Sequence, residues 1–295
     1  MSTHHPSPWH HEGIERRFVD LTPGQVHLRV SRAEPVGSEP PLLMLHASPA
    51  SSLMLVPLLL QLAAGRRCFA PDTPGFGDSA APTQEIPEAS DYAATMLEML
   101  DALGLEQVDL YGSHTGAHIA VELAILAPTR IRRLVLDGVA LFDAEEKAAV
   151  LADYAPAVKP DIIGSQFNWA WHFVRDQAVY FPYFRRDKEH LRQADMSGEE
   201  LLHVTAVDVL KALWTYHLGY RAAFRHEDRQ RLPLVGQRTL VMADLGDPLH
   251  VTVDLGAELV PDGVAWKCAS AASDAGLSAK AQGIAMFLRT GSAPK

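Results

Sequence analysis

The chain has 295 residues, 47% of them hydrophobic and 21% charged, a balance typical of a water-soluble globular protein. Its formal net charge is −10 and no run is rich in lysine and arginine, which argues against a nucleic-acid partner. The two cysteines, Cys68 and Cys268, are too few for a disulfide framework, so we expect a reducing, cytoplasmic setting.

The start of the chain and its longest apolar run predict neither export nor membrane insertion. MSTHHPSPWHHEG lacks the basic-then-apolar pattern of a signal peptide, and the apolar run at 52–64 is interrupted by Pro57 and too short to span a bilayer. The start is rich in histidine, but no spaced set of further ligands accompanies it. We predict an unstructured head there, and no metal site or cofactor in the protein. The histidines of this head are His4, His5, His10 and His11.

Short β-favouring runs alternate with helical patterns over the first 140 residues. RRFVDL and QVHLRV predict two strands joined by the turn TPGQ, and PLLMLHA, RRCFAP, QVDLY and IRRLVLDGV predict four more. Helical patterns near 52–64, 89–103 and 115–128 separate the later strands. Solidly apolar strands alternating with helices indicate a parallel sheet covered on both faces, which binds ligands beyond the carboxyl ends of its strands.

The strand signal disappears between residues 141 and 231 and then returns. This stretch is helical in pattern and rich in aromatic residues, which predicts a helical cap of residues 141–231 inserted into a core of residues 1–140 and 232–295. A substrate pocket is expected between cap and core. The aromatic residues expected to line it are Trp169, Trp171 and Trp214.

Four segments resemble, in the right order, the motifs of the α/β-hydrolase fold family. LLMLHASPASS (42–52) is similar to its oxyanion turn and FAPDTPGFGDS (69–79) to its D-x-P-G-x-G-x-S loop. The stretch at 108–139 resembles the nucleophile elbow, and TLVMADLGDPL (239–249) resembles the strand before the catalytic acid, which would be Asp247. The resemblance implies an α/β fold: a mostly parallel sheet of about eight strands, flanked by helices, with an inserted helical cap as in epoxide hydrolases, haloalkane dehalogenases and C–C bond hydrolases.

Two positions depart from the family's pattern. The elbow, YGSHTGAH, carries His114 where the resemblance implies a serine or aspartate nucleophile, with Ser113 beside it. The segment CASAASDAGLSAKA (268–281), where the family has its catalytic histidine, contains none. Because a serine nucleophile needs an adjacent base, the sequence does not predict ordinary Ser-His-Asp acyl transfer.

We predict instead a His114–Asp247 dyad. Histidine is longer than serine, so a ring on the elbow is expected to occupy the space of the usual base and to hydrogen-bond to Asp247. The backbone N–H groups of Ser48 and Thr115 are expected to form the oxyanion hole. The expected function is that of a hydrolase or lyase that acts by general-base catalysis on a small apolar or aromatic carbonyl-type substrate.

Two other functions stay open. The first alternative is a family member that binds a ligand without turnover. The second is a hydrolase that uses Ser113, or a relocated histidine of the cap such as His217. Ser113 is expected to point away from the pocket. A small molecule is the expected partner, and a homodimer stays open.

Several further residues have both a chemical and a structural interpretation. Asp143 is an alternative position for the acid, His46 is expected to hold the oxyanion turn, and Asp274 lies near the missing base. His118, four residues after His114, could share a metal with it, but the sequence shows no third ligand.

Overall fold

The computed structural model describes residues 9–32, 39–192 and 196–294, so His4 and His5 of the histidine-rich head lie outside the described residues. Its centre is an eight-stranded sheet in the order β1-β2-β4-β3-β5-β6-β7-β8. Strands β1, β2 and β4 pair antiparallel and the remaining neighbours pair parallel, which confirms the predicted mostly parallel sheet. The strands are β1 (Ile14–Leu21), β2 (Gly24–Ser31), β3 (Leu42–Leu45), β4 (Cys68–Pro71), β5 (Val108–Ser113), β6 (Ile131–Asp137), β7 (Arg238–Asp244) and β8 (Gly263–Cys268).

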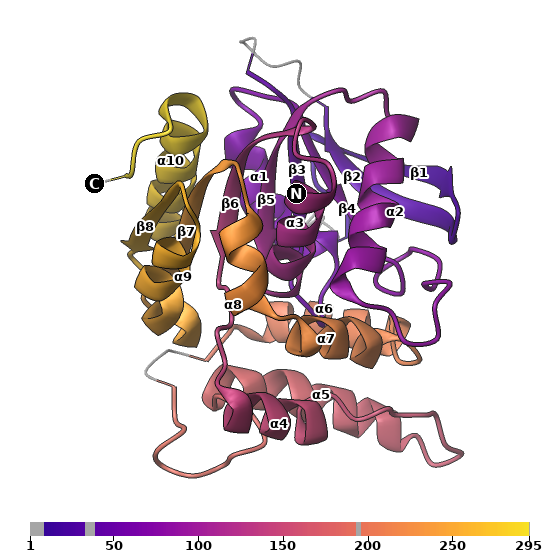
Figure 1. Cartoon of the computed structure of the whole chain (residues 1–295). Coiled ribbons are helices and arrows are strands. Elements are labelled where there is room, and N and C mark those ends of the chain that lie inside the picture. The colour runs from indigo at the N-terminus through magenta and orange to yellow at the C-terminus, as the bar shows by residue number, and fades with distance from the viewer. Residues whose placement is uncertain (1–8, 33–38, 193–195, 295) are drawn as a thin grey trace, which may run out of the picture.

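Helices cover both faces of this sheet (Figure 1). One apolar cluster joins the sheet to α2 (Ala89–Ala102), α3 (Thr115–Leu126) and α9 (Val253–Leu259). A second joins the opposite face to α1 (Val56–Leu62) and α10 (Asp274–Thr290). Strand β3 is buried at every residue because its side chains enter these clusters alternately, Leu43 and Leu45 on one face, Leu42 and Met44 on the other.

The described residues between β6 and β7, 138–192 and 196–237, contain helices and no strand of the sheet, and we call this segment the helical insertion. In Figure 1, α4 and α5 form a layer below α6 and α7, which lie between that layer and the sheet. A third cluster, mostly aromatic, holds these helices together and includes Phe173, Tyr216 and Tyr220. The helices are α4 (Ala144–Asp153), α5 (Ser165–Val179), α6 (Glu199–Lys211), α7 (Tyr216–Arg225) and α8 (Asp228–Arg231).

Three short 3-10 helices complete the described chain: η1 (Ser52–Leu55), η2 (Leu232–Leu234) and η3 (Pro248–Thr252). η1 follows the turn after β3 and η3 follows β7, so both lie at the carboxyl edge of the parallel strands. None of the helices in the described part of the chain combines the length and the apolar character that crossing a bilayer requires.

Candidate active site

His114 occupies the tight turn between β5 and α3. Its φ and ψ are 49° and −113°, and among the described residues it is the only one other than glycine with a positive φ. Gly112 and Gly116 make the turn possible, because a Cβ on Gly112 would collide with the carbonyl of Gly116 and one on Gly116 with that of Leu45. The strained backbone lifts the His114 side chain above the carboxyl edge of the sheet.

The structure brings His114 and Asp247 together. His114 Nε2 lies 2.8 Å from Asp247 Oδ2, with side-chain exposures of 39% and 13%. Asp247 precedes η3, and its Oδ1 accepts a hydrogen bond of 2.8 Å from the backbone N–H of Leu249, which fixes the carboxylate. The ring lies against Gly138, where a Cβ would approach His114 Cε1 to 2.9 Å. A glycine after β6 is therefore needed to accommodate the ring.

The other ring nitrogen faces a serine. Ser113 Oγ lies 3.1 Å from His114 Nδ1. An ionised carboxylate only accepts hydrogen bonds, so Nε2 must carry the proton shared with Asp247 and Nδ1 is the basic atom of the neutral ring. Ser113 is 5% exposed and is absent from the described lining of the pocket. Its contact with Nδ1 was not predicted.

The charges of the dyad shift both pKa values. Loss of water around the His114 ring would lower its pKa, but the charge and hydrogen bond of Asp247 outweigh this, so the pKa of His114 is raised above 6.5. Burial would raise the pKa of Asp247, but His114 outweighs it and the pKa of this carboxyl lies below its ordinary value. Asp247 is therefore ionised at neutral pH.

A buried polar network lies beneath the elbow. Tyr111 donates a hydrogen bond of 2.5 Å to Asp137 Oδ2, and Lys280 Nζ lies 2.7 Å from the same oxygen. Lys280 lies on α10, within the segment 268–281 where the family has its histidine. Burial opposes the charge of Lys280, but Asp137 outweighs it and raises the pKa of the ammonium group. The positively charged ammonium group of Lys280 is therefore part of the network beneath the elbow.

The oxyanion hole was expected from the backbone N–H groups of two residues, Ser48 and Thr115. Ser48 and Thr115 both line the pocket that contains His114, and within the described part of the chain no hydrogen bond engages either N–H. His46 holds the turn from behind: its Nε2 accepts a hydrogen bond of 2.9 Å from the backbone N–H of Thr73, and its Nδ1 lies 2.9 Å from the carbonyl of Ala47. His46 is 1% exposed.

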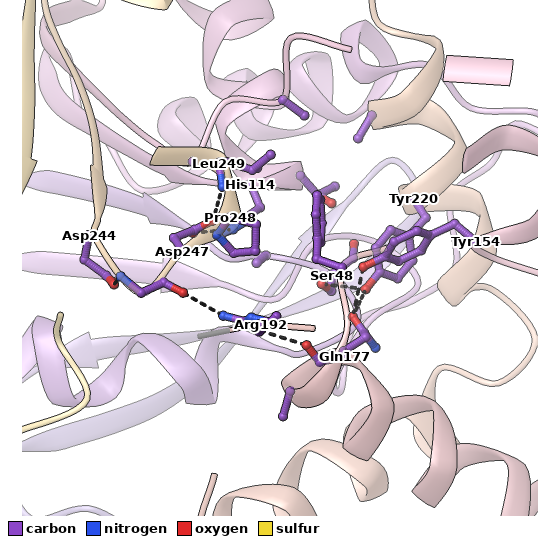
Figure 2. Close-up of a pocket in the computed structure, with 18 of the residues that line it drawn as sticks. Ser48, His114, Tyr154, Gln177, Arg192, Tyr220, Asp244, Asp247, Pro248 and Leu249 are labelled. Carbon is purple, nitrogen blue, oxygen red and sulfur yellow. Dashed lines mark hydrogen bonds and ion pairs between the residues drawn. The ribbon is translucent and has the colours of Figure 1, made fainter. Parts of the chain in front are cut away.

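The pocket is a cavity of about 410 Å³ that opens beside His114 and Asp247. Its opposite wall comes from the helical insertion, including Tyr154, Gln177 and Tyr220 (Figure 2). Arg192 bridges the two sides, donating to the carbonyls of Gln177 at 2.8 Å and Gly246 at 2.9 Å. Among the described lining residues it is the only lysine or arginine.

The tryptophans expected at the pocket lie elsewhere. Trp169 stacks on Phe173, with ring centroids 4.9 Å apart, because the aromatic cluster of the insertion draws it inward. Trp171 and Trp214 are 38% and 60% exposed. The rings that do line the pocket are Phe142, Tyr154, Phe181, Tyr220 and Phe224.

The other candidates named from the sequence stand apart from the dyad. Asp143 is the N-cap of α4, where its carboxylate accepts from the N–H of Glu146. Asp274 is exposed in the first turn of α10, and His217 on α7 is not among the lining residues. Asp143 therefore has a structural role at the start of α4, and neither Asp274 nor His217 lines the pocket.

Sequence reasoning missed Arg192, Lys280 and Asp137. Arg192 lies in a polar stretch without periodicity, and nothing local distinguishes it from the exposed arginines nearby. Lys280 and Asp137 are about 140 residues apart and meet only because α10 packs behind β6. The only sequence feature that could have pointed to this network is that Lys280 lies within a run of small residues.

The chain belongs to the α/β-hydrolase fold family, whose sequence model, described as alpha/beta hydrolase fold, matches residues 40–251. The chain is 40% identical over 104 residues to a 2-hydroxymuconate semialdehyde hydrolase of Pseudomonas sp. (strain CF600), which covers 33% of this chain and 36% of that protein. It is 29% identical over 135 residues to haloalkane dehalogenase 2 of Mycobacterium tuberculosis (strain H37Rv), covering 46% of each. These matches therefore span between a third and a half of the curated relatives.

Similar solved structures cover almost the whole chain at low identity. Epoxide hydrolase A of Mycobacterium thermoresistibile is similar to it with a TM-score of 0.69 and 19% identity, covering 94% of this chain and 98% of that one. A hydrolase of Pseudomonas aeruginosa PA01 gives a TM-score of 0.65 and 20% identity, covering 93% and 98%. At such identities these structures establish the fold alone.

Proposed function

We propose that this chain is an enzyme, a hydrolase or lyase that acts on a small apolar or aromatic carbonyl-type molecule. The observation that carries the proposal is the 2.8 Å contact between His114 Nε2 and Asp247 Oδ2 at the wall of a 410 Å³ pocket. Hydrolysis is the broader reaction class in the names of several relatives. General-base catalysis by a positioned histidine contributes about 10²–10⁴-fold to a rate.

In this mechanism His114 accepts a proton at Nδ1, since Nε2 carries the proton held by Asp247. The proton comes from a water molecule in hydrolysis, or from the carbon beside the substrate carbonyl in lyase chemistry. Negative charge that develops on the carbonyl oxygen is stabilised by the N–H groups of Ser48 and Thr115. Because Ser113 Oγ stands 3.1 Å from Nδ1, proton transfer requires this hydroxyl to turn aside.

A second candidate function rests on the same contact. Ser113 Oγ, His114 and Asp247 form a continuous hydrogen-bonded chain, the arrangement by which a histidine activates a serine nucleophile. Against it stands the 5% exposure of Ser113, outside the described pocket lining. General-base action by His114 is therefore the preferred proposal.

One experiment separates these functions. Esters, lactones and enolisable ketones of pocket size are tested with the wild-type protein and with His114→Ala, Ser113→Ala and the control His203→Ala, which removes an exposed histidine of α6. General-base catalysis predicts a loss of about 10²-fold or more for His114→Ala, and at most a small loss for the other two.

Other results would overturn the proposal in distinguishable ways. Stoichiometric labelling by a fluorophosphonate probe that Ser113→Ala abolishes would establish the serine mechanism. Turnover that His114→Ala leaves unchanged would exclude the dyad. Binding of panel compounds without any turnover would identify a ligand-binding protein.

A further inference from the structure

A second histidine cluster lies between α3 and the segment that joins α7 to α8. His118 Nδ1 on α3 is 2.8 Å from Asp228 Oδ1, and His226 Nδ1 is 2.8 Å from the same oxygen. The three side chains are only 3%, 5% and 7% exposed, in the order His118, His226, Asp228. Each offers one ligand-type atom, and these atoms all lie within 4.8 Å of one another. The fold therefore groups His118 with His226 and Asp228, and not with His114 as the sequence had suggested.

Outer partners orient one of these rings as they do in metal sites. His226 Nε2 lies 2.7 Å from Glu122 Oε1, and Arg231 holds both oxygens of that carboxylate at 2.7 Å. Histidines that bind metals usually donate their second N–H to a carboxylate or carbonyl, which fixes the ring and the tautomer. Glu122 plays that part for His226 and leaves its Nδ1 directed at Asp228.

The two histidine rings carry different numbers of protons with and without a bound metal ion. Without a metal, both Nδ1 atoms must donate a proton to Asp228 Oδ1, and His226 must also donate at Nε2 to Glu122. That ring is then a buried imidazolium ion. A metal ion in place of the two Nδ1 protons leaves both rings neutral and keeps the contact with Glu122. Metal bonds of about 2.0–2.1 Å then require the donor atoms to move apart by a few tenths of an ångström.

We propose that His118, His226 and Asp228 bind one divalent transition-metal ion of the Zn²⁺ class. Two imidazole nitrogens and one carboxylate oxygen suit Zn²⁺, Co²⁺ or Ni²⁺, whereas Mg²⁺ and Ca²⁺ prefer oxygen ligands alone. Three protein ligands leave a position of a four-coordinate ion for water. His226 and Asp228 also line a cavity of about 370 Å³, which gives the ion a route from solvent.

The site connects two parts of the fold. His118 and Glu122 belong to α3, which packs on the sheet, whereas His226 and Asp228 lie where the helical insertion returns toward β7. An ion that binds only the folded chain stabilises it by mass action. Metal binding is therefore expected to raise the melting temperature, because the ion links the segment containing His226 and Asp228 to α3.

The test measures metal binding directly and does not depend on any enzymatic activity. To limit Co²⁺ binding to the cluster, the experiment uses untagged full-length protein in which the four histidines of the head are replaced by alanine: His4, His5, His10 and His11. After treatment with a chelator, Co²⁺ is added and followed by the visible absorption of the four- or five-coordinate ion. We expect one equivalent to bind and the melting temperature to rise; zinc analysis of the purified protein gives an independent stoichiometry.

Substitutions in the cluster test which residues bind the metal ion. His226→Ala and Asp228→Asn are expected to weaken Co²⁺ binding at least a hundredfold, and Glu122→Gln about 10–100-fold because it removes the outer partner. His190→Ala, which removes a histidine paired with Asp187 outside the cluster, is the matched control and should bind as wild type does.

The proposal is wrong if the protein with the substituted head binds no stoichiometric Co²⁺, or if His226→Ala and Glu122→Gln bind it undiminished. Should His226→Ala fail to fold, Glu122→Gln and the wild-type stoichiometry still decide. Neither negative result bears on the proposed role of His114.

Discussion

At the scale of single residues, the His114–Asp247 pair predicts a particular pH dependence. His114 must be unprotonated to act as a base, and Asp247 raises its pKa above 6.5. The rate kcat/KM should therefore rise with pH along a limb centred above pH 6.5. Asp247→Asn removes the charge that raises this pKa, so the limb should move to lower pH while the rate falls about 10²-fold or more. NMR titration of the His114 ring measures the same shift without a substrate; an unchanged titration in Asp247→Asn would contradict the pairing.

Gly138 is predicted to be required for the position of the His114 ring. Gly138→Ala places a Cβ 2.9 Å from His114 Cε1 and forces alanine to a φ of +76°. We expect a loss of about 1–3 kcal/mol in the free energy of unfolding and a displaced ring with impaired catalysis. Gly164→Ala is the matched control, because Gly164 has the same φ of +76° but faces Phe167 in the insertion. Gly164→Ala should lower the free energy of unfolding by a similar amount, because of the same positive φ, and should leave the titration of His114 unchanged.

Arg192 is predicted to select for anionic or electron-rich substrates. Its guanidinium group lies at the pocket, where within the described chain it donates to carbonyls and contacts no carboxylate. A hydrogen bond to a charged group contributes about 1.5–3 kcal/mol, so Arg192→Met should weaken binding of a carboxylate-bearing ligand about tenfold or more. Binding of the matching neutral amide should change little. Arg17→Met, at an exposed arginine of β1, is the control, and equal losses for both ligands would contradict the prediction.

At the scale of elements, the helical insertion depends on its own aromatic cluster. Phe173 on α5 is 2% exposed and contacts the rings of Trp169 and Tyr216, among others. Phe173→Ala should cost about 3–5 kcal/mol in the free energy of unfolding, because it removes buried area and leaves a cavity. Trp214→Ala, at a ring that is 60% exposed, should cost about 0.5 kcal/mol or less. Denaturant unfolding of both variants checks this, and equal costs would show that the cluster is not a core.

At the scale of the whole molecule, Asp72 links the sheet to the turn before α1. Its carboxylate accepts from His27 Nδ1 at 2.8 Å and from the backbone N–H of Ser52 at 2.8 Å, with Arg29 nearby. Burial alone would raise the pKa of Asp72, but His27 and Arg29 outweigh it and the pKa lies below 3.8. This pairing thus stabilises the fold above about pH 4, and that contribution is lost as the pH falls through the folded-state pKa.

Asp72→Asn is accordingly predicted to lower the free energy of unfolding at pH 7 by about 3–5 kcal/mol, because Arg29 is left buried without its carboxylate. It should also flatten the dependence of stability on pH in the acid range. The control is Asp254→Asn, at a carboxylate 64% exposed beside Lys267, with an expected effect within about 0.5 kcal/mol. Urea unfolding between pH 3 and 7 measures both; an Asp72→Asn curve parallel to wild type would contradict the assignment.

Most of the fold was predictable from the sequence because its signals are local. The apolar run LLML of β3 and the alternation of strands with helices predicted a mostly parallel sheet, and the glycines around His114 predicted the turn between β5 and α3. The same reasoning predicted the contact between His114 and Asp247, since two family motifs placed both residues at one edge of the sheet. The sheet and the turn depend on spacing along the chain, which a sequence displays directly, whereas the contact between His114 and Asp247 was predicted from the family resemblance.

The parts that could not be predicted arise from packing between distant segments. Trp169 packs against the ring of Tyr216 on α7 because the insertion forms its own core, and its local sequence does not show this contact. His118 and Asp228 are 110 residues apart and meet only when the insertion returns to α3. The sequence by itself determined the family, the sheet and the dyad, whereas only the tertiary structure decided which side chains surround them, because those contacts close over long loops.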